Sequence, residues 1–393
     1  MAPVLKILVI GNYPPMTQQS MLRFGDLICG LYAEAGHEVR LLQQPVLLGR
    51  LVPNAEQGLG KWLGYLDRFV LFRWSLRKAL AWADVVHLCD QGNAMMVPWL
   101  RHKPHLVTCH DLLAIRGAQG VIANYHVSRT GRMLQRWIAS GLRRAQRVVC
   151  VSEQTRRELQ AVLCLSDDRV SVVYNGLNYP YSPMPPEQAR ARLSALGLDV
   201  DQPFVLHVGG NQWYKNRVGV VRIFSQLTRD PAFAACRLVL AGKPWPQDLT
   251  TAVQQSELAD RVHAVTGADN EDLRALYSLA EFLLFPSLAE GFGWPIAEAM
   301  ASGCPVVTSN RAPMTEVGGD AALFIDPEGA DAAKEIAAFL ESGETLRLRG
   351  KGLRQAAKFN DSSMRAGYLQ VIQELLGLQE SIDREDRSPG KAL

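Results

Sequence analysis

The chain has little cysteine and no long apolar run. Its seven cysteines are scattered among 393 residues and none stands in a Cys-x-x-Cys pair, which excludes a disulfide framework and a zinc-finger pattern. We therefore expect reduced, mostly buried thiols in a cytoplasmic protein. No stretch of about 18 apolar residues is free of charge, so we predict no helix that spans a bilayer. The apolar start at residues 1–11 is too brief for a signal peptide.

Internal repeats and low-complexity tracts are also missing, which excludes solenoid and fibrous folds. Short apolar runs separated by helical patterns predict buried parallel strands and therefore two doubly wound α/β domains. The predicted strands are 5–10, 37–42, 84–88, 105–109, 147–151, 169–175, 204–208, 237–241, 261–265, 282–285, 305–309 and 323–325. A proline cluster at 179–186 predicts the linker between the domains. Chemistry is expected in the loops that follow the strands.

The strongest local signal follows the predicted strand at 282–285. Gly291 and Gly293 let backbone N–H groups approach a ligand, and Pro295 suits the first turn of a helix. Such a helix start is a site for an anion, most naturally a phosphate. Glu290 and Glu298 bracket it, and because carboxylates repel phosphates, each is expected to meet hydroxyl groups. The pattern predicts a nucleotide sugar; an ordinary turn with two surface glutamates is the alternative.

The run from Glu290 to Glu298 resembles the E-x7-E motif of glycosyltransferase family 4, whose members are retaining enzymes of GT-B fold. The resemblance continues through residues 298–310, 316–322 and 326–327, and upstream it covers 273–286. In the first half it includes 13–15, 36–39, 108–111, 151–152 and 175–176. It implies two Rossmann-like domains facing across a cleft. Residues 1–180 would lie on the acceptor side, 181–360 would bind the donor, and a helix at 361–378 would return to the first domain. Residues 379–393 are expected to be disordered.

The resemblance also implies roles for single residues. Glu290 would contact the donor sugar and Glu298 the ribose, while His110 would lie near the reacting carbon. The backbone of the loop between the two glutamates would hold sugar or phosphate oxygens through Gly291, Phe292 and Gly293. A lone histidine after a strand is more often structural, as we expect for His87.

A second loop, 208–217, follows the predicted strand at 204–208. Breaking a nucleotide sugar builds negative charge on the leaving diphosphate, and a fixed cation there stabilises the transition state. The family commonly supplies an arginine and a lysine from this loop. Lys215 matches the lysine, but Gly210 stands where the arginine is common, so Arg217 and Asn211 are the candidates to replace it. The alternative for Lys215 is a solvated surface lysine.

Two further loops complete the predicted site. Residues 11–20 lack the paired glycines common in the family, and Gln18, Gln19 and Ser20 are candidates to donate hydrogen bonds to phosphates or acceptor. Plain helix capping by Ser20 is the alternative. Thr266 and Ala268 follow the strand at 261–265 and are expected to border the nucleobase through their backbone.

Charge is unevenly distributed. Residues 1–180 hold 21 Lys and Arg against 12 Asp and Glu, whereas residues 181–393 hold 21 against 27. Aromatic and basic residues interleave at 61–78, and arginines recur at 129–147. Such stretches suit a lipid interface. A helix with its aromatics in the core and its charges in water is the alternative, and we favour it.

The sequence thus predicts an enzyme that transfers a sugar from a nucleotide-diphosphate sugar to an acceptor hydroxyl on a glycan or a lipid-linked molecule, with retention. We expect no metal or other cofactor, because the cationic loop and the helix start can do the work of a metal, and we expect no nucleic-acid partner. Peripheral membrane contact is a further expectation. The alternatives are a GT-B epimerase or phosphorylase and a non-catalytic protein that binds nucleotide sugars.

Overall fold

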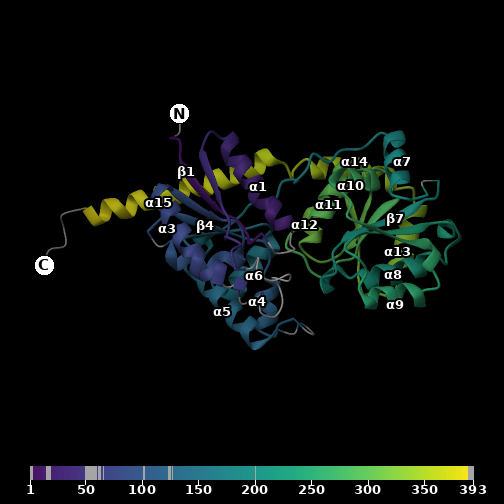
Figure 1. Ribbon diagram of the computed structural model, residues 1–393. Helices are drawn as coiled ribbons and strands as arrows, with labels where there is room; N and C mark the ends of the chain where they lie inside the picture. Colours follow the sequence, from purple (N-terminus) through teal and green to yellow (C-terminus); the bar gives the residue numbers. More distant parts are fainter. Residues whose placement is uncertain are drawn as a thin grey trace. The chain divides into compact units, whose positions relative to one another are not determined.

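The computed structural model describes residues 3–14, 19–48, 60, 63–64, 66–100, 102–122, 125, 127–199 and 201–387, with side chains omitted at 19, 20, 69 and 378–387. The chain divides into two compact units (Figure 1). Residues 1–178 and 361–393 form the first unit, and residues 179–360 form the second. The sequence placed this boundary at 180, and it placed the final helix with the first domain, where the structure has it.

The first unit contains a parallel sheet of six strands in the order β2-β1-β3-β4-β5-β6. Its strands are β1 (Lys6–Ile10), β2 (Glu38–Leu42), β3 (Val85–Leu88), β4 (His105–Cys109), β5 (Arg147–Cys150) and β6 (Val170–Val172). The central strands β3, β4 and β5 are buried along their whole length, because helices cover both faces of the sheet.

The second unit repeats this design with the order β12-β11-β10-β7-β8-β9, again all parallel. Its strands are β7 (Phe204–Gly209), β8 (Arg237–Gly242), β9 (Val262–Thr266), β10 (Phe282–Phe285), β11 (Val306–Ser309) and β12 (Ala322–Ile325). All twelve predicted strands are therefore confirmed, although β6 is shorter than predicted.

Helices connect the strands in both units. In the first unit they are α1 (Gln19–Glu34), α3 (Phe72–Trp82) after the π-helical turn η2 (Asp67–Leu71), α4 (Leu113–Ala118), α5 (Arg129–Arg144), α6 (Glu153–Leu163) and α15 (Asp361–Arg387), with 3-10 turns η3 (Gln91–Trp99) and η4 (Asp167–Arg169). In the second they are α7 (Pro186–Ala195), α8 (Arg217–Leu227), α9 (Gln247–Gln255), α10 (Asn270–Leu279), α11 (Trp294–Ala301), α12 (Met314–Gly318), α13 (Ala332–Glu341) and α14 (Thr345–Ala356), with η5 (Trp213–Lys215), η6 (Pro231–Phe233) and η7 (Ala259–Arg261).

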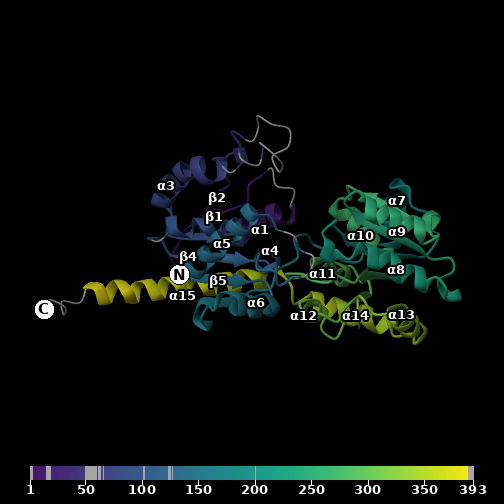
Figure 2. The same ribbon diagram turned by 90° about the horizontal axis from the view of Figure 1, so that it is seen from below.

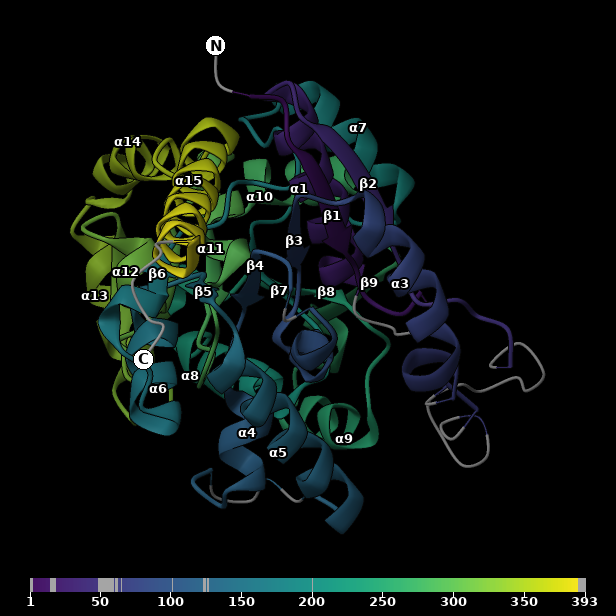
Figure 3. The same cartoon turned by 90° about the vertical axis from the view of Figure 1, so that its left-hand side faces the viewer.

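The first sheet separates two helical layers. Helices α3, η3, α5 and α6 share one apolar core against one face of the sheet. Helices α1 and α15 contact each other on the opposite side, as Figure 3 shows. Ser152 caps α6 by accepting a hydrogen bond from the Thr155 N–H at 3.1 Å, as the sequence predicted. Within the described residues, no helix has the length and apolar character needed to cross a membrane.

Two features differ from the predicted connections. The proline-rich linker packs on α10, because Arg274 donates a hydrogen bond to the Ser182 carbonyl (2.7 Å) and the Met184 N–H donates to Ser278 Oγ (2.9 Å). The linker therefore belongs to the second unit rather than forming a free tether. Helix α15 also continues to Arg387, beyond the end at residue 378 that the sequence predicts, while residues 388–393 of the predicted disordered tail lie outside the described residues.

A buried chain of hydrogen bonds holds α15 on the first sheet. Tyr32 OH lies 2.9 Å from His87 Nδ1, and His87 Nε2 lies 2.8 Å from Thr108 Oγ1. Thr108 Oγ1 lies 2.9 Å from Tyr368 OH. The four side chains come from α1, β3, β4 and α15, and all are fully buried. His87 is therefore a structural histidine, as predicted.

Burial lowers the pKa of His87 to about 3, below that of an exposed histidine near 6.5. Between these values the unfolded chain binds more protons than the folded one. Burial lowers the pKa of His105 and His110 of the same unit as well, so His87 contributes one part of the expected fall in its free energy of unfolding, about 1.4 kcal/mol for each pH unit below 6.5. Urea titrations between pH 7 and pH 5 measure this slope. This slope should become shallower by about 1.4 kcal/mol per pH unit in His87→Asn and stay unchanged in His102→Gln, which replaces an exposed histidine. Equal slopes in all three proteins would contradict the assignment.

Candidate active site

Strand order brings two loops together in the second unit. The order reverses between β10 and β7, and ligands of open α/β sheets bind beyond the carboxyl ends of the strands at such a point. The loop after β7 holds Lys215, and the loop after β10 holds Glu290. Because β7 and β10 are neighbours in the sheet, residues 75 positions apart in the chain meet at one edge.

Backbone and amide contacts join these two loops. Asn216 adopts a left-handed conformation (φ 54°) between η5 and α8, and its Nδ2 donates to the Pro286 carbonyl at 3.0 Å. The Leu288 N–H donates to the Tyr214 carbonyl at 2.7 Å. These bonds set the separation of the loops independently of the charged groups that they carry.

Lys215 and Glu290 form an ion pair at this edge. Lys215 Nζ donates to both carboxylate oxygens of Glu290, at 2.8 and 3.0 Å. The lysine side chain is 16% exposed and that of the glutamate 8%. Nζ also lies 5.3 Å from the Phe285 ring centroid and 5.6 Å from that of Tyr214. Lys215 is therefore not a solvated surface lysine, and the pair places a cation and an acceptor of hydroxyl protons side by side.

The two candidates to replace the arginine absent at Gly210 contact each other. Arg217 Nη1 donates to Asn211 Oδ1 and to the Lys243 carbonyl (3.1 Å), while Asn211 Nδ2 donates to the Pro244 carbonyl (2.8 Å). Both ends of the Asn211 amide are thus used within the protein. Arg217 is buried, burial lowers its pKa, and its Nε and Nη2 have no hydrogen-bond partner among the described residues. Arg217 therefore anchors the loop from the buried side, through its contacts with Asn211 and Lys243.

The helix start predicted after Glu290 is present. Gly293 precedes α11 with φ 97°, a conformation that only glycine adopts without strain, and Pro295 lies in the first turn. Phe292 is buried and its ring packs edge-on against Phe359 at 5.4 Å. The Phe292 side chain thus anchors the loop, while Gly291 and Gly293 flank it at the start of the helix.

Glu298 lies one turn inside α11 and is buried. Tyr277 of α10 donates its hydroxyl proton to Glu298 Oε2 at 2.9 Å, which fixes the carboxylate. Burial, with Glu298 beside it, raises the pKa of Tyr277 well above its usual value, so the phenol stays a donor. The sequence identified Glu298 but not Tyr277, whose spacing from Glu298 carries no recognisable signal.

Thr266 ends β9, and Ala268 follows Gly267, which has φ 74°. Both lie at the carboxyl end of β9, two strands from β7, on the same edge of the sheet as Lys215. Thr266 is exposed and Ala268 is half-buried. Their predicted contact with a nucleobase stays a prediction.

His110 belongs to the first unit and follows β4. Its Nε2 donates to the Cys89 carbonyl at 2.8 Å, so Nδ1 is the unprotonated nitrogen of the neutral ring. Its backbone N–H donates to Gln91 Oε1 at 2.9 Å, and the ring packs edge-on against Phe24. Burial lowers the pKa of His110, which keeps the ring neutral.

A polar cluster near His110 escaped the sequence analysis. Asn12 Nδ2 donates to Asp90 Oδ2 (2.6 Å), and Asn93 Nδ2 donates to Asn12 Oδ1 (3.0 Å). These residues follow β1 and β3, where the order of the first sheet reverses. Buried polar groups at such a point are typical of a ligand-binding edge, but single polar residues after strands are too common to be recognised in a sequence. Gln18 lies outside the described residues, as do the side chains of Gln19 and Ser20.

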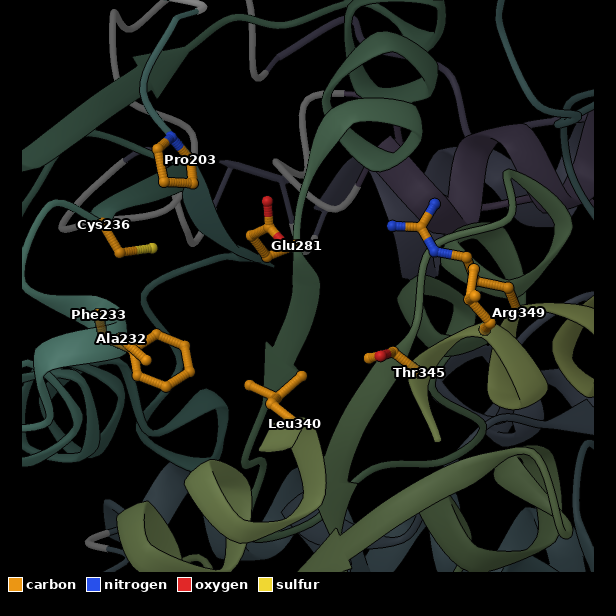
Figure 4. Close-up of a pocket in the computed structure, with 9 residues that line it drawn as sticks. Pro203, Ala232, Phe233, Cys236, Glu281, Leu340, Thr345 and Arg349 are labelled. Atoms are coloured by element: carbon orange, nitrogen blue, oxygen red, sulfur yellow. The ribbon is translucent and has the colours of Figure 1, made fainter. Parts of the chain in front are cut away.

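A cavity of about 490 Å³ lies at the opposite end of the second sheet (Figure 4). Its lining includes Pro203, Cys236 and Glu281, which precede β7, β8 and β10. The cavity is therefore separate from the Lys215–Glu290 pair.

The same end of the sheet holds one Asp-x-Asp triplet at 199–201, where Asp199 pairs with Arg237 at 3.3 Å. Across the described residues, His, Cys, Asp and Glu do not gather in any group of three that could hold a metal ion.

Comparison with known proteins identifies the family. The model of Glycosyltransferase Family 4 matches residues 26–179, and the model of Glycosyl transferases group 1 matches residues 190–355. The two matches together extend over both units of the chain. The chain belongs to glycosyltransferase family 4 and is a glycosyltransferase, which confirms the resemblance and sets aside the non-catalytic alternative.

Individual relatives agree with this assignment. The O-antigen chain mannosyltransferase B of Escherichia coli is 28% identical over 287 residues, which cover 72% of this chain and 74% of that protein. Sucrose-phosphate synthase from Thermosynechococcus elongatus shares the fold with a TM-score of 0.75 over 95% of this chain and 100% of that chain, at 22% identity. The Anabaena Alr3699/HepE in complex with UDP and glucose gives a TM-score of 0.70 at 16% identity, over 94% and 99% of the two chains. The GT-B fold is confirmed.

Proposed function

We propose that the protein moves a sugar from a nucleoside-diphosphate sugar to an acceptor hydroxyl, with retention at the anomeric carbon. The observation that carries the proposal is the Lys215–Glu290 pair beside the start of α11, at the edge where the strand order reverses. A diphosphate placed there meets a cation and the backbone N–H groups of a helix start. A sugar attached to it meets the Glu290 carboxylate.

The chemistry follows from this placement. The bond between the anomeric carbon and the phosphate oxygen breaks while the acceptor oxygen bonds to the same face of the sugar. The leaving phosphate oxygen takes the acceptor proton. Lys215 stabilises the charge that grows on the diphosphate, more in the transition state than in the bound substrate. Glu290 accepts hydrogen bonds from sugar hydroxyls while it still accepts those from Lys215, because a carboxylate has about four acceptor sites.

The other predicted residues take supporting roles in this proposal. Glu298, oriented by Tyr277, accepts ribose hydroxyls, and Thr266 and Ala268 border the base. The predicted role of His110, whose ring is neutral, at the reacting carbon is retained as part of the proposal. Arg217 positions the Lys215 loop through Asn211 rather than replacing the missing arginine as a direct phosphate ligand. Since Lys215 and the helix start supply the positive field, we propose that transfer needs no metal.

The relatives inform the choice of substrates. A relative named for O-antigen chain mannosyl transfer supports a glycan or lipid-linked acceptor and a mannosyl donor as first candidates. The neighbour solved with UDP and glucose makes UDP-glucose a second donor to test. All seven cysteines are free thiols, which supports a reducing compartment and a cytoplasmic location. Peripheral contact at a membrane is a separate part of the proposal.

The proposal is tested with UDP, GDP, ADP and TDP sugars. A ligand that binds only the folded chain raises its melting temperature, so the cognate donor is the one that does so. Nucleotide release is then followed with glycan and lipid-linked acceptors, with and without a chelator, and the anomeric configuration of the product is read by NMR. An epimerase would need no acceptor, and a phosphorylase would need free phosphate. Nucleotide release that never depends on an acceptor would contradict transfer.

The role of Glu298 has its own test. Glu298→Gln removes the charge that ribose hydroxyls would bind, and we expect the affinity for the nucleoside diphosphate to fall about 10- to 100-fold. Tyr277→Phe removes only the orienting bond and should cost less. The matched control is Glu271→Gln, since Glu271 also accepts from a tyrosine hydroxyl, that of Tyr179, elsewhere in the second unit. Calorimetric titration that finds equal affinities for Glu298→Gln and Glu271→Gln would refute the role.

A further inference from the structure

Helix α5 presents a basic and apolar face to solvent. Residues three, four and seven apart share one side of a helix. On α5 the exposed side consists of Arg129, Arg132, Met133, Arg136, Trp137, Arg143 and Arg144. Met133 is 52% exposed and Trp137 is 55% exposed. The helix contains no acidic residue.

The opposite side of α5 is packed in the core of the first unit. Ile138 and Leu142 are buried in the core cluster of this layer. A Cβ added to Gly141 would lie 1.9 Å from the Ala94 carbonyl oxygen, so α5 lies directly on η3. The helix therefore cannot rotate to bury Met133 and Trp137 without leaving the core.

The arginines of this face lack partners. Among the residues that the structure describes, none of the five forms an ion pair, whereas Arg116 and Arg147 of the same unit pair with Glu158 and Glu374. Residues 101–150 hold nine Lys and Arg and one Asp. The face is thus positively charged, and no acidic residue of α5 itself offsets that charge.

A second helix of the same layer has a similar face. Helix α3 buries Phe72 and Leu76 but exposes Trp74 (75%) together with Arg73, Arg77 and Lys78. The favoured prediction of core-facing aromatics is therefore right for Phe72 and wrong for Trp74, while Lys61, Trp62 and Tyr65 lie outside the described residues. The Arg73 guanidinium lies 5.8 Å from the Trp99 ring of η3, the element that α5 also contacts. Figure 3 shows α3 and α5 on the side of the sheet away from α15, and Figure 2 also shows α3 away from α15.

We propose that the exposed face of α5, extended by that of α3, docks on an anionic lipid surface. Arginine binds lipid phosphates, while tryptophan and methionine side chains insert at the level of the headgroups. Each basic residue near an anionic bilayer adds to the affinity. A fluid surface adapts to side chains that project from a helix, whereas a folded protein partner would need a matching groove. This docking rests on the proposed function, because the face would be the surface through which the enzyme approaches a lipid-linked acceptor.

The test uses the full chain and vesicles of phosphatidylcholine with and without phosphatidylglycerol. We expect binding only to the anionic vesicles, weakened by salt. Arg132→Gln with Arg136→Gln should weaken it about 30-fold. Met133→Ser with Trp137→Ser should also weaken it, but without changing its dependence on salt. The matched controls are Lys334→Gln with Arg347→Gln, which removes the same charge from the second unit, and Leu346→Ser, which removes an exposed apolar side chain there.

Three results would overturn the proposal: equal binding to neutral vesicles, unchanged binding of both α5 double variants, or tight binding to RNA with none to vesicles. Nucleotide-induced thermal shifts are measured on the same preparations. Both α5 variants should keep them, because the nucleotide site lies in the second unit. A failure of the proposed function would instead abolish the thermal shift in the parent protein while leaving vesicle binding intact.

Discussion

Replacing Glu290 by alanine is expected to lower the rate of sugar transfer by about 100- to 1,000-fold, the range for removing one polar group that stabilises a transition state. The variant loses both the acceptor for sugar hydroxyls and the partner that holds Lys215 Nζ. The parent and variant are compared by steady-state kinetics with the donor found by thermal shift. Glu341→Gln, at the exposed end of α13, is the control and should keep full activity.

Lys215→Met should have an effect of similar size, and the double variant should be little worse than either single one. Groups that act as a unit lose their shared contribution once. Folding should survive, because the lysine side chain reaches water and the two loops are also joined through Asn216. We expect a loss of less than about 3 kcal/mol in the free energy of unfolding. Full activity of Glu290→Ala, or exact additivity in the double variant, would contradict the assigned roles.

Ending the chain after Asn360 is expected to prevent the first unit from folding. The truncation removes Met364, Tyr368, Val371, Ile372 and Leu375, all buried on the first unit. Burial of such side chains contributes about 1.5 to 3 kcal/mol each, so the total approaches the full stability of a typical domain. The expected result is an insoluble product or the loss of one cooperative transition in calorimetry.

A second truncation, after Gly377, is the matched control, since it keeps every one of these buried residues. Tyr368→Phe is milder still: it removes one hydroxyl from the chain that includes Thr108 and His87, and should cost about 1 to 2 kcal/mol. A soluble protein with two unfolding transitions after truncation at Asn360 would show that α15 is dispensable for the first unit.

Much of the fold was predictable because its signals are local. Runs such as Lys6–Ile10 are apolar over a strand's length, so they need burial on both faces and hence a parallel sheet covered by helices. Ser152 directly before an amphipathic stretch predicts a helix start, because a capping side chain and the backbone N–H that it binds are close neighbours in the sequence. The end of α15 was missed because the charged residues 383–387 resemble a disordered tail, although they continue a helix that is packed further upstream.

The chemistry of the candidate site was only partly predictable. The residues from Glu290 to Glu298 lie in one loop and one helix, so their spacing is visible in the sequence. By contrast, the contact of Glu290 with Lys215 depends on β7 lying beside β10, which no local pattern reveals. The same holds for the contact of Asn12 with Asp90. It also holds for Arg217, a candidate phosphate ligand in the sequence, which the structure shows bonded to the Lys243 carbonyl.

By itself, the amino-acid sequence determined which segments of this chain become strands and helices, that there are two α/β units, and which glutamates surround the start of α11. Those properties arise from periodicity and short motifs, in which the interacting groups are neighbours along the chain. Only the tertiary structure decided that Lys215 is paired, and that Trp74 and Trp137 point to solvent while Phe72 does not. These depend on strand order and on packing between distant segments, where a side chain's partner is set by the fold rather than by its neighbours in sequence.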